Sequence, residues 1–350
     1  MLQVAPIKRD VIDLWPVAES GLPVRVTNSV TPTGVHTIGQ LRSWSDQQLL
    51  TLRSFGRISL GHVRTFFRHC NQIEQGKQAF QNIREVFAIF LDDAEMKVLS
   101  ARYGFDEREL LASNDWKTLQ EIGDLEHKTR ERVRQIQETA TAKLKSRLAA
   151  VCLQPFQEVF MRFINDHGKV IDGADLAPLQ NDPLLGGCNV CGIVLLLSDL
   201  DPKRILFYHN LFSTLPESTI QTVESQAMAV LEKAARPVGI QEIVEAVPDN
   251  SDLPTPENKA HAVAWVMDHC PAAAATQDGR YFLYSSGTHA FLAEILKSLA
   301  RPIHYRAVTN AFNDRVKPFS RKGAGFILDM LNANRQCTRV DRGVYDLKAD

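Results

Sequence analysis

The side chains with the clearest chemistry lie in one short segment, residues 129–136. Arginine can donate two hydrogen bonds to guanine, glutamine can pair with adenine, and glutamate can accept a bond from cytosine. At helical spacing, Arg130, Glu131, Arg134 and Gln135 share the outer face of the first half of one helix. This combination is typical of a helix that reads base edges in the major groove of DNA.

The second helix of a helix-turn-helix would hold these side chains, and the local sequence supports one. Thr129 is expected to cap its start, because its hydroxyl can accept a bond from a backbone N–H group. Glu131 in the first turn suits the positive end of the helix dipole. Val133, Ile136 and Ala140 recur at helical spacing, so we expect them to pack inward.

A shorter helix is expected before the reading helix. Leu119, Ile122 and Leu125 place apolar side chains on one face of it, and Gly123 leaves room for close approach of the second helix. A solvated charged face on an ordinary helix is the alternative interpretation of residues 129–136. The upstream half of the motif favours the helix-turn-helix.

Residues 90–148, which contain this motif, resemble region four of the principal bacterial sigma factors. The resemblance rests on residues 91–99, 102–105, 118–136 and 142–145. Region four grips the promoter −35 element, so the resemblance implies promoter-like DNA as the ligand. The implied DNA contacts are Thr129, Arg130, Glu131, Arg134 and Gln135. Residues 106–116 depart from the pattern, because they form a longer link than the family usually has.

A second readable unit spans residues 19–72. Within it, residues 46–60 predict a short helix, a glycine turn and a new helix, which is a helix-hairpin-helix signature. Gly56 can adopt a backbone conformation that other residues resist. The free N–H groups that open the next helix would suit a phosphate.

This second unit resembles the C-terminal domain of the bacterial RNA polymerase alpha subunit, which binds DNA through the minor groove and backbone. Ile58 stands where the family usually has lysine, and His62 where it usually has an acid, so a weaker phosphate grip is expected. A helix-hairpin-helix used only for protein contact is the alternative. The DNA-facing residues that the resemblance implies are Arg25, Asn28, Ser29, Gly56 and Ser59.

The charge distribution agrees with two DNA-facing surfaces. The chain has 350 residues and a net charge of −1, which argues against a simple polycation. Residues 20–70 carry six arginines against Asp46 alone, a net +5, and residues 128–148 also sum to +5. The intervening residues 71–127 sum to −6. Two basic patches separated by an acidic spacer indicate two surfaces that face nucleic acid.

The second half of the sequence contains a repeat. Residues 235–243 match residues 300–308 at a period of 65, and each copy is followed by a helical pattern and a hairpin, at 277–284 and 339–347. Helix, turn, helix, helix, hairpin is the order of a winged helix. The final copy resembles the winged-helix family of restriction endonucleases, chromatin proteins and the polymerase delta subunit. Basic residues near its third helix predict a contact with nucleic acid or polymerase: Arg315, Lys317, Arg321 and Lys322.

A weaker third copy is expected before these two. Residues 156–164 would be its first helix, 168–171 its turn and 204–209 its last strand.

Other chemistry is not expected. Cys188 and Cys191 form a lone pair, whereas a structural zinc site needs four ligands. No nucleophile–base constellation, phosphate loop or paired-carboxylate motif stands out, and His304 is interpreted as a partly buried turn residue. No apolar run approaches the ~20 residues of a membrane span. We therefore expect no catalytic residue, metal, cofactor, membrane partner or small-molecule substrate, and no enzyme activity.

The predicted fold is mainly α and multi-domain: a helix-hairpin-helix, a helix-turn-helix and two or three winged helices with small β-hairpins. The expected function is a DNA-binding transcription regulator or auxiliary RNA polymerase factor in the cytoplasm, associated with the nucleoid. Double-stranded DNA is the expected partner and RNA polymerase core a second candidate. A DNA-targeting or scaffold subunit of a restriction or defence system is one alternative, and a protein-binding decoy another. The predicted divisions are 1–18 (tail), 19–72 (the alpha-like module), 73–150 (the sigma-like module), 151–214, 215–286 and 287–350 (winged helices).

Overall fold

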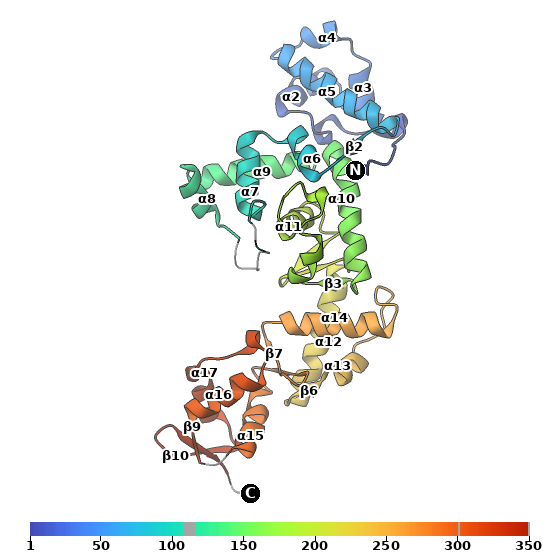
Figure 1. The fold of residues 1–350 in the computed structure, drawn as a ribbon. Helices are drawn as coiled ribbons and strands as arrows, with labels where there is room; N and C mark the ends of the chain where they lie inside the picture. Colours follow the sequence, from blue (N-terminus) through green and yellow to red (C-terminus); the bar gives the residue numbers. More distant parts are fainter. Residues whose placement is uncertain (108, 110–115, 300–301, 349–350) are drawn as a thin grey trace. The chain divides into compact units, whose positions relative to one another are not determined.

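The fold comes from a computed structural model that describes residues 1–107, 109, 116–299 and 302–348. This part of the protein is mainly helical, with small antiparallel sheets of two or three strands (Figure 1), which confirms the predicted class. It divides into two compact units. The first unit holds residues 1–163 and 172–207, and the second holds residues 164–171 and 208–350.

The N-terminal segment, predicted as a tail, is folded onto the first unit. Strand β1 (Leu2–Gln3) pairs antiparallel with β2 (Ala79–Phe80). The short helix α1 (Arg9–Asp13) buries Ile12, and Val4 is also buried. These apolar side chains lose their contact with water by packing against the alpha-like module.

The alpha-like module is built from short capped helices around one long helix. Thr37 and Ser45 each form a complete capping box, which satisfies free N–H groups at two helix starts. Arg42 joins three helices, since it pairs with Asp13 and with Glu74 at 2.9 Å each. The elements are η1 (Val17–Glu19), α2 (Val24–Val30), η2 (Thr31–Thr33), α3 (Ile38–Arg42), α4 (Asp46–Leu50) and α5 (Arg57–Glu74).

The described residues of the sigma-like module form the helices α6 (Ile83–Phe90), α7 (Asp93–Tyr103), α8 (Leu119–Glu126) and α9 (Arg130–Leu144). Asp92 caps α7 through a capping box, and Gly104 ends it in the left-handed conformation at φ 61°. Lys143 on α9 binds the buried Glu95 on α7 at 2.6 Å. Helix α9 packs against α7 and crosses it in the view of Figure 1. The predicted long link, residues 106–116, falls largely outside the described residues.

Two further helices complete the first unit. The long α10 (Arg147–Asp166) follows α9, and α11 (Val190–Leu200) is buried from Val190 to Ser198. A Cβ on Gly192 would lie 2.0 Å from the carbonyl oxygen of Tyr103, so α11 packs directly on the end of α7. The short turns between α10 and α11 are η3 (Ala174–Leu179) and η4 (Pro183–Leu185).

The second unit repeats one order of elements, as the sequence period predicts. In each copy the first strand pairs with the last: β6 with β8, and β9 with β11. Gly279 and Gly343 have positive φ at the two hairpin turns. One copy holds α12 (Glu217–Ala234), β6 (Val238–Gly239), α13 (Ile240–Ala246), α14 (Pro256–His269), β7 (Ala273–Ala275) and β8 (Arg280–Leu283). The other holds α15 (Thr288–Ser298), β9 (Ile303–His304), α16 (Tyr305–Arg315), η5 (Pro318–Ser320), α17 (Ala324–Ala333), β10 (Cys337–Asp341) and β11 (Val344–Leu347).

The third copy differs from its prediction. The segment predicted as a turn is a strand, β3 (Val170–Ile171), and it pairs with β5 (Leu211–Ser213). The predicted last strand corresponds to β4 (Leu206–Tyr208), and β5 follows it. The pairing of first with last strand is nevertheless the one seen in the other copies. Membership of the winged-helix family stays a prediction for all three.

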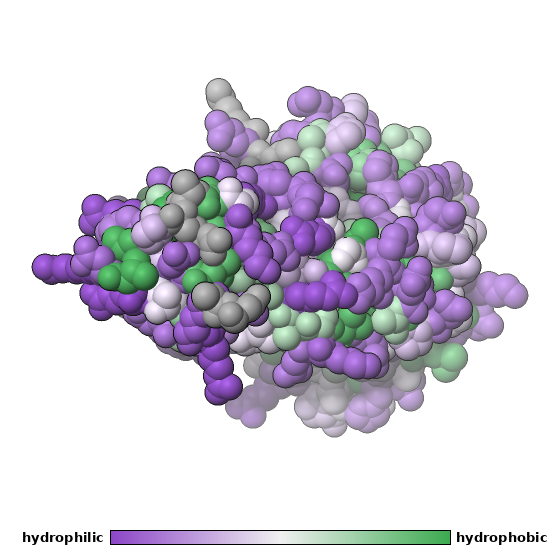
Figure 2. All heavy atoms as spheres, turned by 90° about the horizontal axis from the view of Figure 1, so that it is seen from below, coloured by the Kyte–Doolittle hydropathy of each residue, from purple (hydrophilic) through white to green (hydrophobic). Residues whose placement is uncertain are grey.

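The surface is mostly polar. Figure 2 shows polar side chains over most of the face it presents, with apolar ones in small, scattered areas. Among the described residues, no helix is long and apolar enough to cross a membrane.

Candidate nucleic-acid interface

The helix-turn-helix forms as the spacing predicts. Thr129 caps α9, its hydroxyl accepting a bond from the N–H of Arg132. Thr118 caps α8 with a complete capping box. A Cβ on Gly123 would lie 2.6 Å from the carbonyl oxygen of Lys128, so the turn requires glycine where α8 meets the start of α9.

The inner and outer faces of α9 also agree with prediction. Val133, Ile136 and Ala140 are buried, the first two in a cluster with Val98 and Ile122. The outer residues Arg130, Glu131, Arg134 and Gln135 are exposed. On α8 the prediction was wrong for Leu125, which is 61% exposed.

The outer side chains of α9 bond to one another. Arg134 donates from Nε and Nη2 to the two carboxylate oxygens of Glu131, at 2.9 and 2.7 Å. Its Nη1 donates to Glu138, one turn further along. Gln135 donates to Glu131 at 3.2 Å. Glu131 therefore braces both residues that are suited to reading purines, while Glu138 occupies the remaining end of the Arg134 fork.

This network sets the charge of the reading face. The bonds from Arg134 and Gln135 lower the pKa of Glu131 to about 2, although the carboxylate is exposed. The same pairing, with Glu131 first and Glu138 second, raises the pKa of Arg134. Both groups stay charged at any physiological pH. Local sequence spacing contains the i, i+3 and i, i+4 signals for these pairs, but Glu138 was not among the predicted site residues.

The second set of predicted DNA contacts lies where α2, the turn before α5 and the start of α5 meet. Arg25 is exposed, and its Nε donates to the carbonyl oxygen of Ser54 at 3.0 Å. Asn28 is exposed, and the hydroxyl of Ser29 donates to the carbonyl of Arg25. Ser54 has φ 63°, so the left-handed turn residue is Ser54 and not Gly56.

Gly56 has a different role from the one predicted. Its backbone is extended, at φ −127°, and a Cβ there would meet no atom within 4 Å. The protein's own packing therefore does not require glycine at this position. A missing Cβ in open space leaves the first N–H groups of α5 accessible to a phosphate.

Two residues that follow Gly56 differ in exposure. The predicted contact Ser59 is buried, with 4% exposed, because it lies on the inner face of α5 next to Leu60. Its hydroxyl therefore does not face a ligand in this structure. Ile58 is 81% exposed, in the place where a lysine was expected. Val24, directly before Arg25, is 72% exposed.

The basic residues near the last copy are partly engaged within the second unit. Lys317 binds Asp268 at 2.6 Å, and Arg315 donates to the hydroxyl of Ser298. Lys322 lies 3.8 Å from the ring centroid of Tyr284. Arg321 is exposed. His304 is exposed and caps α16, which corrects its interpretation as a partly buried turn residue.

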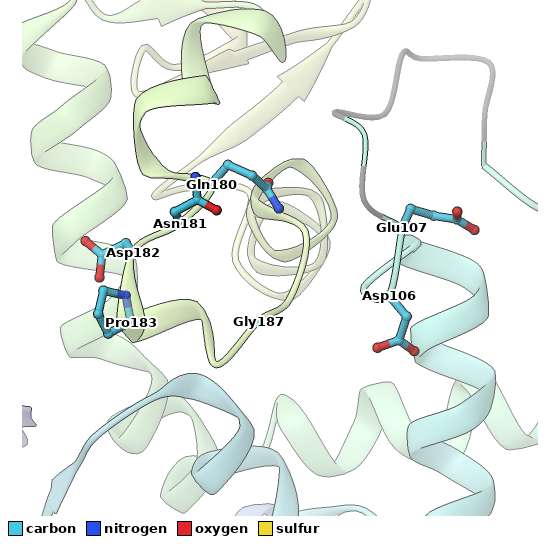
Figure 3. A pocket seen from close by; sticks show the side chains of 7 residues that line it. All are labelled: Asp106, Glu107, Gln180, Asn181, Asp182, Pro183 and Gly187. Carbon is cyan, nitrogen blue, oxygen red and sulfur yellow. The ribbon is translucent and has the colours of Figure 1, made fainter.

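One pocket in the first unit does not suit nucleic acid. It has a volume of about 550 Å³, and its polar lining includes three carboxylates, from Asp106, Glu107 and Asp182. Figure 3 shows these side chains around the opening, with Gln180 and Asn181 on the same rim as Asp182. Such a lining would repel phosphate. Among the described residues, no group of three or more His, Cys, Asp or Glu side chains could hold a metal ion.

Cys188 and Cys191 are buried cysteines. Cys191 donates to the carbonyl of Gly173 at 3.3 Å, so these residues serve packing in the first unit.

Comparison with known proteins supports both resemblances. Residues 10–67 match the family model for the C-terminal domain of the bacterial RNA polymerase alpha chain, and residues 91–146 match that of Sigma-70, region 4. Together these matches support a DNA-binding, transcription-related role.

Curated relatives match a short part of the sequence. The DNA-directed RNA polymerase subunit alpha of Cutibacterium acnes is 45% identical over 49 residues, and that of Frankia alni is 44% identical over 50. Each match covers 14% of this protein and 14% of the relative. No solved structure matches the protein.

Proposed function

We propose that this protein is a sequence-specific, promoter-binding transcription regulator that acts by binding double-stranded DNA. The observation that carries the proposal is the exposed set on α9, held on a helix-turn-helix with both helices capped. Arg134 and Gln135 offer the bidentate groups that distinguish guanine and adenine in the major groove. Glu131 holds them in register before DNA arrives.

The alpha-like module would add a second, less specific contact. Arg25 suits a narrow minor groove, where negative potential is concentrated. The start of α5, open at Gly56, suits a backbone phosphate. Phosphate contacts fix position and base contacts supply sequence, so no reaction chemistry is needed. We therefore propose a binding protein without catalytic activity, with RNA polymerase core as a protein partner.

A DNA-targeting subunit of a restriction or defence system is the second candidate. It is favoured by the repeated helix–strand–helix–helix–hairpin order of the second unit, because the final copy resembles a family that includes restriction endonucleases. The two candidates differ in where the protein should bind: at promoters for a regulator, and at sites unrelated to promoters for a defence subunit.

Selection of bound fragments from genomic DNA, with and without RNA polymerase core, tests the proposal. A shared sequence motif upstream of genes is the expected result, and polymerase core should enrich the same fragments further. Fragments without any common motif would contradict sequence-specific binding. A common motif away from promoters, unaffected by polymerase, would favour the defence subunit.

A further inference from the structure

The alpha-like and sigma-like modules meet in a short seam inside the first unit. The backbone N–H of Leu148 donates to the carbonyl oxygen of Ser20 at 3.3 Å. Beside this bond, Arg147 pairs with Glu19 at 3.1 Å. Ser20 is fully buried and Leu148 nearly so. We define the seam as residues 19–21 on one side and residues 146–148 on the other.

Gly21 is the residue that the seam requires. Its φ of 102° is one that side chains rarely adopt. A Cβ on Gly21 would lie 2.6 Å from Oγ and 3.2 Å from Cβ of Ser146. The hydroxyl could rotate away, but the Cβ of Ser146 cannot move without moving the backbone. The two modules therefore approach to a distance that only glycine allows.

A second pair of buried residues lies beyond the seam. Cys70 on α5 and Cys152 on α10 are both fully buried. Burial raises the pKa of the Cys152 thiol to about 12, and the nearby Cys70 contributes to that rise.

The seam is directly continuous with both DNA-facing helices. Leu22 and Pro23 separate Gly21 from the start of α2, the helix that carries Arg25. Ser146 follows the end of α9 with one residue between. Rotation of one reading helix against the other would have to break the buried bond between Ser20 and Leu148.

From this geometry we infer that the protein reads one composite duplex site, in which two DNA elements must keep one fixed spacing. The inference rests on the proposed function. When two binding surfaces are rigidly linked, the second contact forms at a high effective concentration, and it is lost when geometry forbids both contacts at once. A flexible tether would instead tolerate a range of spacings.

The test is a spacing series on a duplex selected by the full-length protein from a random-sequence pool. Footprinting locates the two protected elements, and base pairs are then inserted between them. About five base pairs turn one element to the opposite side, while about ten restore its side but add a helical turn of length. Either insertion should weaken binding at least 100-fold, to the level of a duplex with one element.

Unchanged binding to the duplex with about ten added base pairs would overturn the inference. So would protection of one element alone, although that result would leave the proposed function standing. Failure to select any duplex would instead contradict the proposed function itself. The wild-type series is decisive even if no seam variant folds.

A matched pair of variants connects the spacing rule to the seam. Gly21→Leu places a side chain against Ser146, while Gly34→Leu places it at φ 85° with no atom within 4 Å of the Cβ. Both substitutions carry the same kind of backbone strain. Gly21→Leu should bind the original and the lengthened duplex with affinities within about threefold of each other, whereas Gly34→Leu should keep the 100-fold preference. Equal spacing preference in two folded variants would show that the seam does not set it.

Discussion

The two surfaces of the first unit that we propose face DNA hold their arginines in different ways. On α9, Arg134 is bound by two carboxylates, of Glu131 and Glu138, on its own helix. On α2, Arg25 donates to a backbone carbonyl, and the apolar side chains of Val24 and Ile58 are exposed in the same module. On α9, DNA would have to displace part of a charged network. The other surface instead combines Arg25 with two further exposed arginines, Arg53 and Arg57, on the turn before α5 and at the start of that helix.

The difference shows how one protein can separate specificity from general attraction. The carboxylates beside Arg134 disfavour random phosphate contacts, because the DNA backbone repels them. A guanine edge offsets that repulsion, because it accepts hydrogen bonds that replace those Arg134 loses to its carboxylate partners. An arginine without acidic neighbours meets no such repulsion, so it suits a minor groove that is recognised by its shape and electrostatic potential.

The largest effect is expected from the ion pair that holds α9 in place. Glu95 has a side chain only 6% exposed and binds Lys143, which is 37% exposed. Glu95→Gln removes the negative charge and leaves the half-buried ammonium of Lys143 without its ionic partner, so the free energy of unfolding should fall by about 3 kcal/mol. Urea denaturation measures this. Glu158→Gln, at an exposed site on α10, is the control and should stay within about 0.5 kcal/mol of wild type.

The next effect tests base reading. Arg134→Ala should cost about 1–3 kcal/mol on the selected duplex and relax its sequence preference. Arg162→Ala removes an exposed arginine from α10 and should leave the preference intact. Competition binding against mismatched duplexes measures both. If Arg134→Ala weakens all sequences equally, Arg134 contacts phosphate and the contrast between the two surfaces is wrong.

A smaller effect is expected on the alpha-like surface. Ile58→Lys restores a positive charge beside the open start of α5, so the salt dependence of binding should steepen by about one unit. Protein stability should hardly change, because Ile58 is already 81% exposed. Leu14→Lys adds the same charge at another exposed position of the first unit and controls for net charge. Equal slopes for the two variants would argue that the start of α5 does not touch DNA.

The parts of this site that local spacing determines could be predicted from sequence. Thr129, Gly123 and the inner face of α9 follow from capping and helical periodicity within twenty residues. The residues that sequence missed depend on distant partners. Glu95 and Lys143 are 48 positions apart, and Gly21 needs Ser146 to explain it.

The burial of Ser59 has a similar origin. A family position identifies which residues align, but the inner face of α5 decides which side chain water or DNA can reach.

The smallest effect concerns the brace on α9. Arg134 and Gln135 lower the pKa of Glu131 from 4.5 to about 2. A carboxylate with a depressed folded-state pKa contributes stability that is present above its unfolded pKa and is lost as the pH falls through the folded value. The contribution of Glu131 should therefore disappear between about pH 4.5 and pH 2. Carboxyl NMR titration measures the pKa of Glu131 directly.

Arg134→Ala should return the pKa of Glu131 toward 4.5, while Glu138→Gln should leave it low, because Glu138 bonds to the other end of the Arg134 guanidinium. If Arg134→Ala leaves the pKa of Glu131 near 2, the hydrogen bonds between Arg134 and Glu131 are absent in solution. Arg134 would then meet DNA without a competing carboxylate, as Arg25 does.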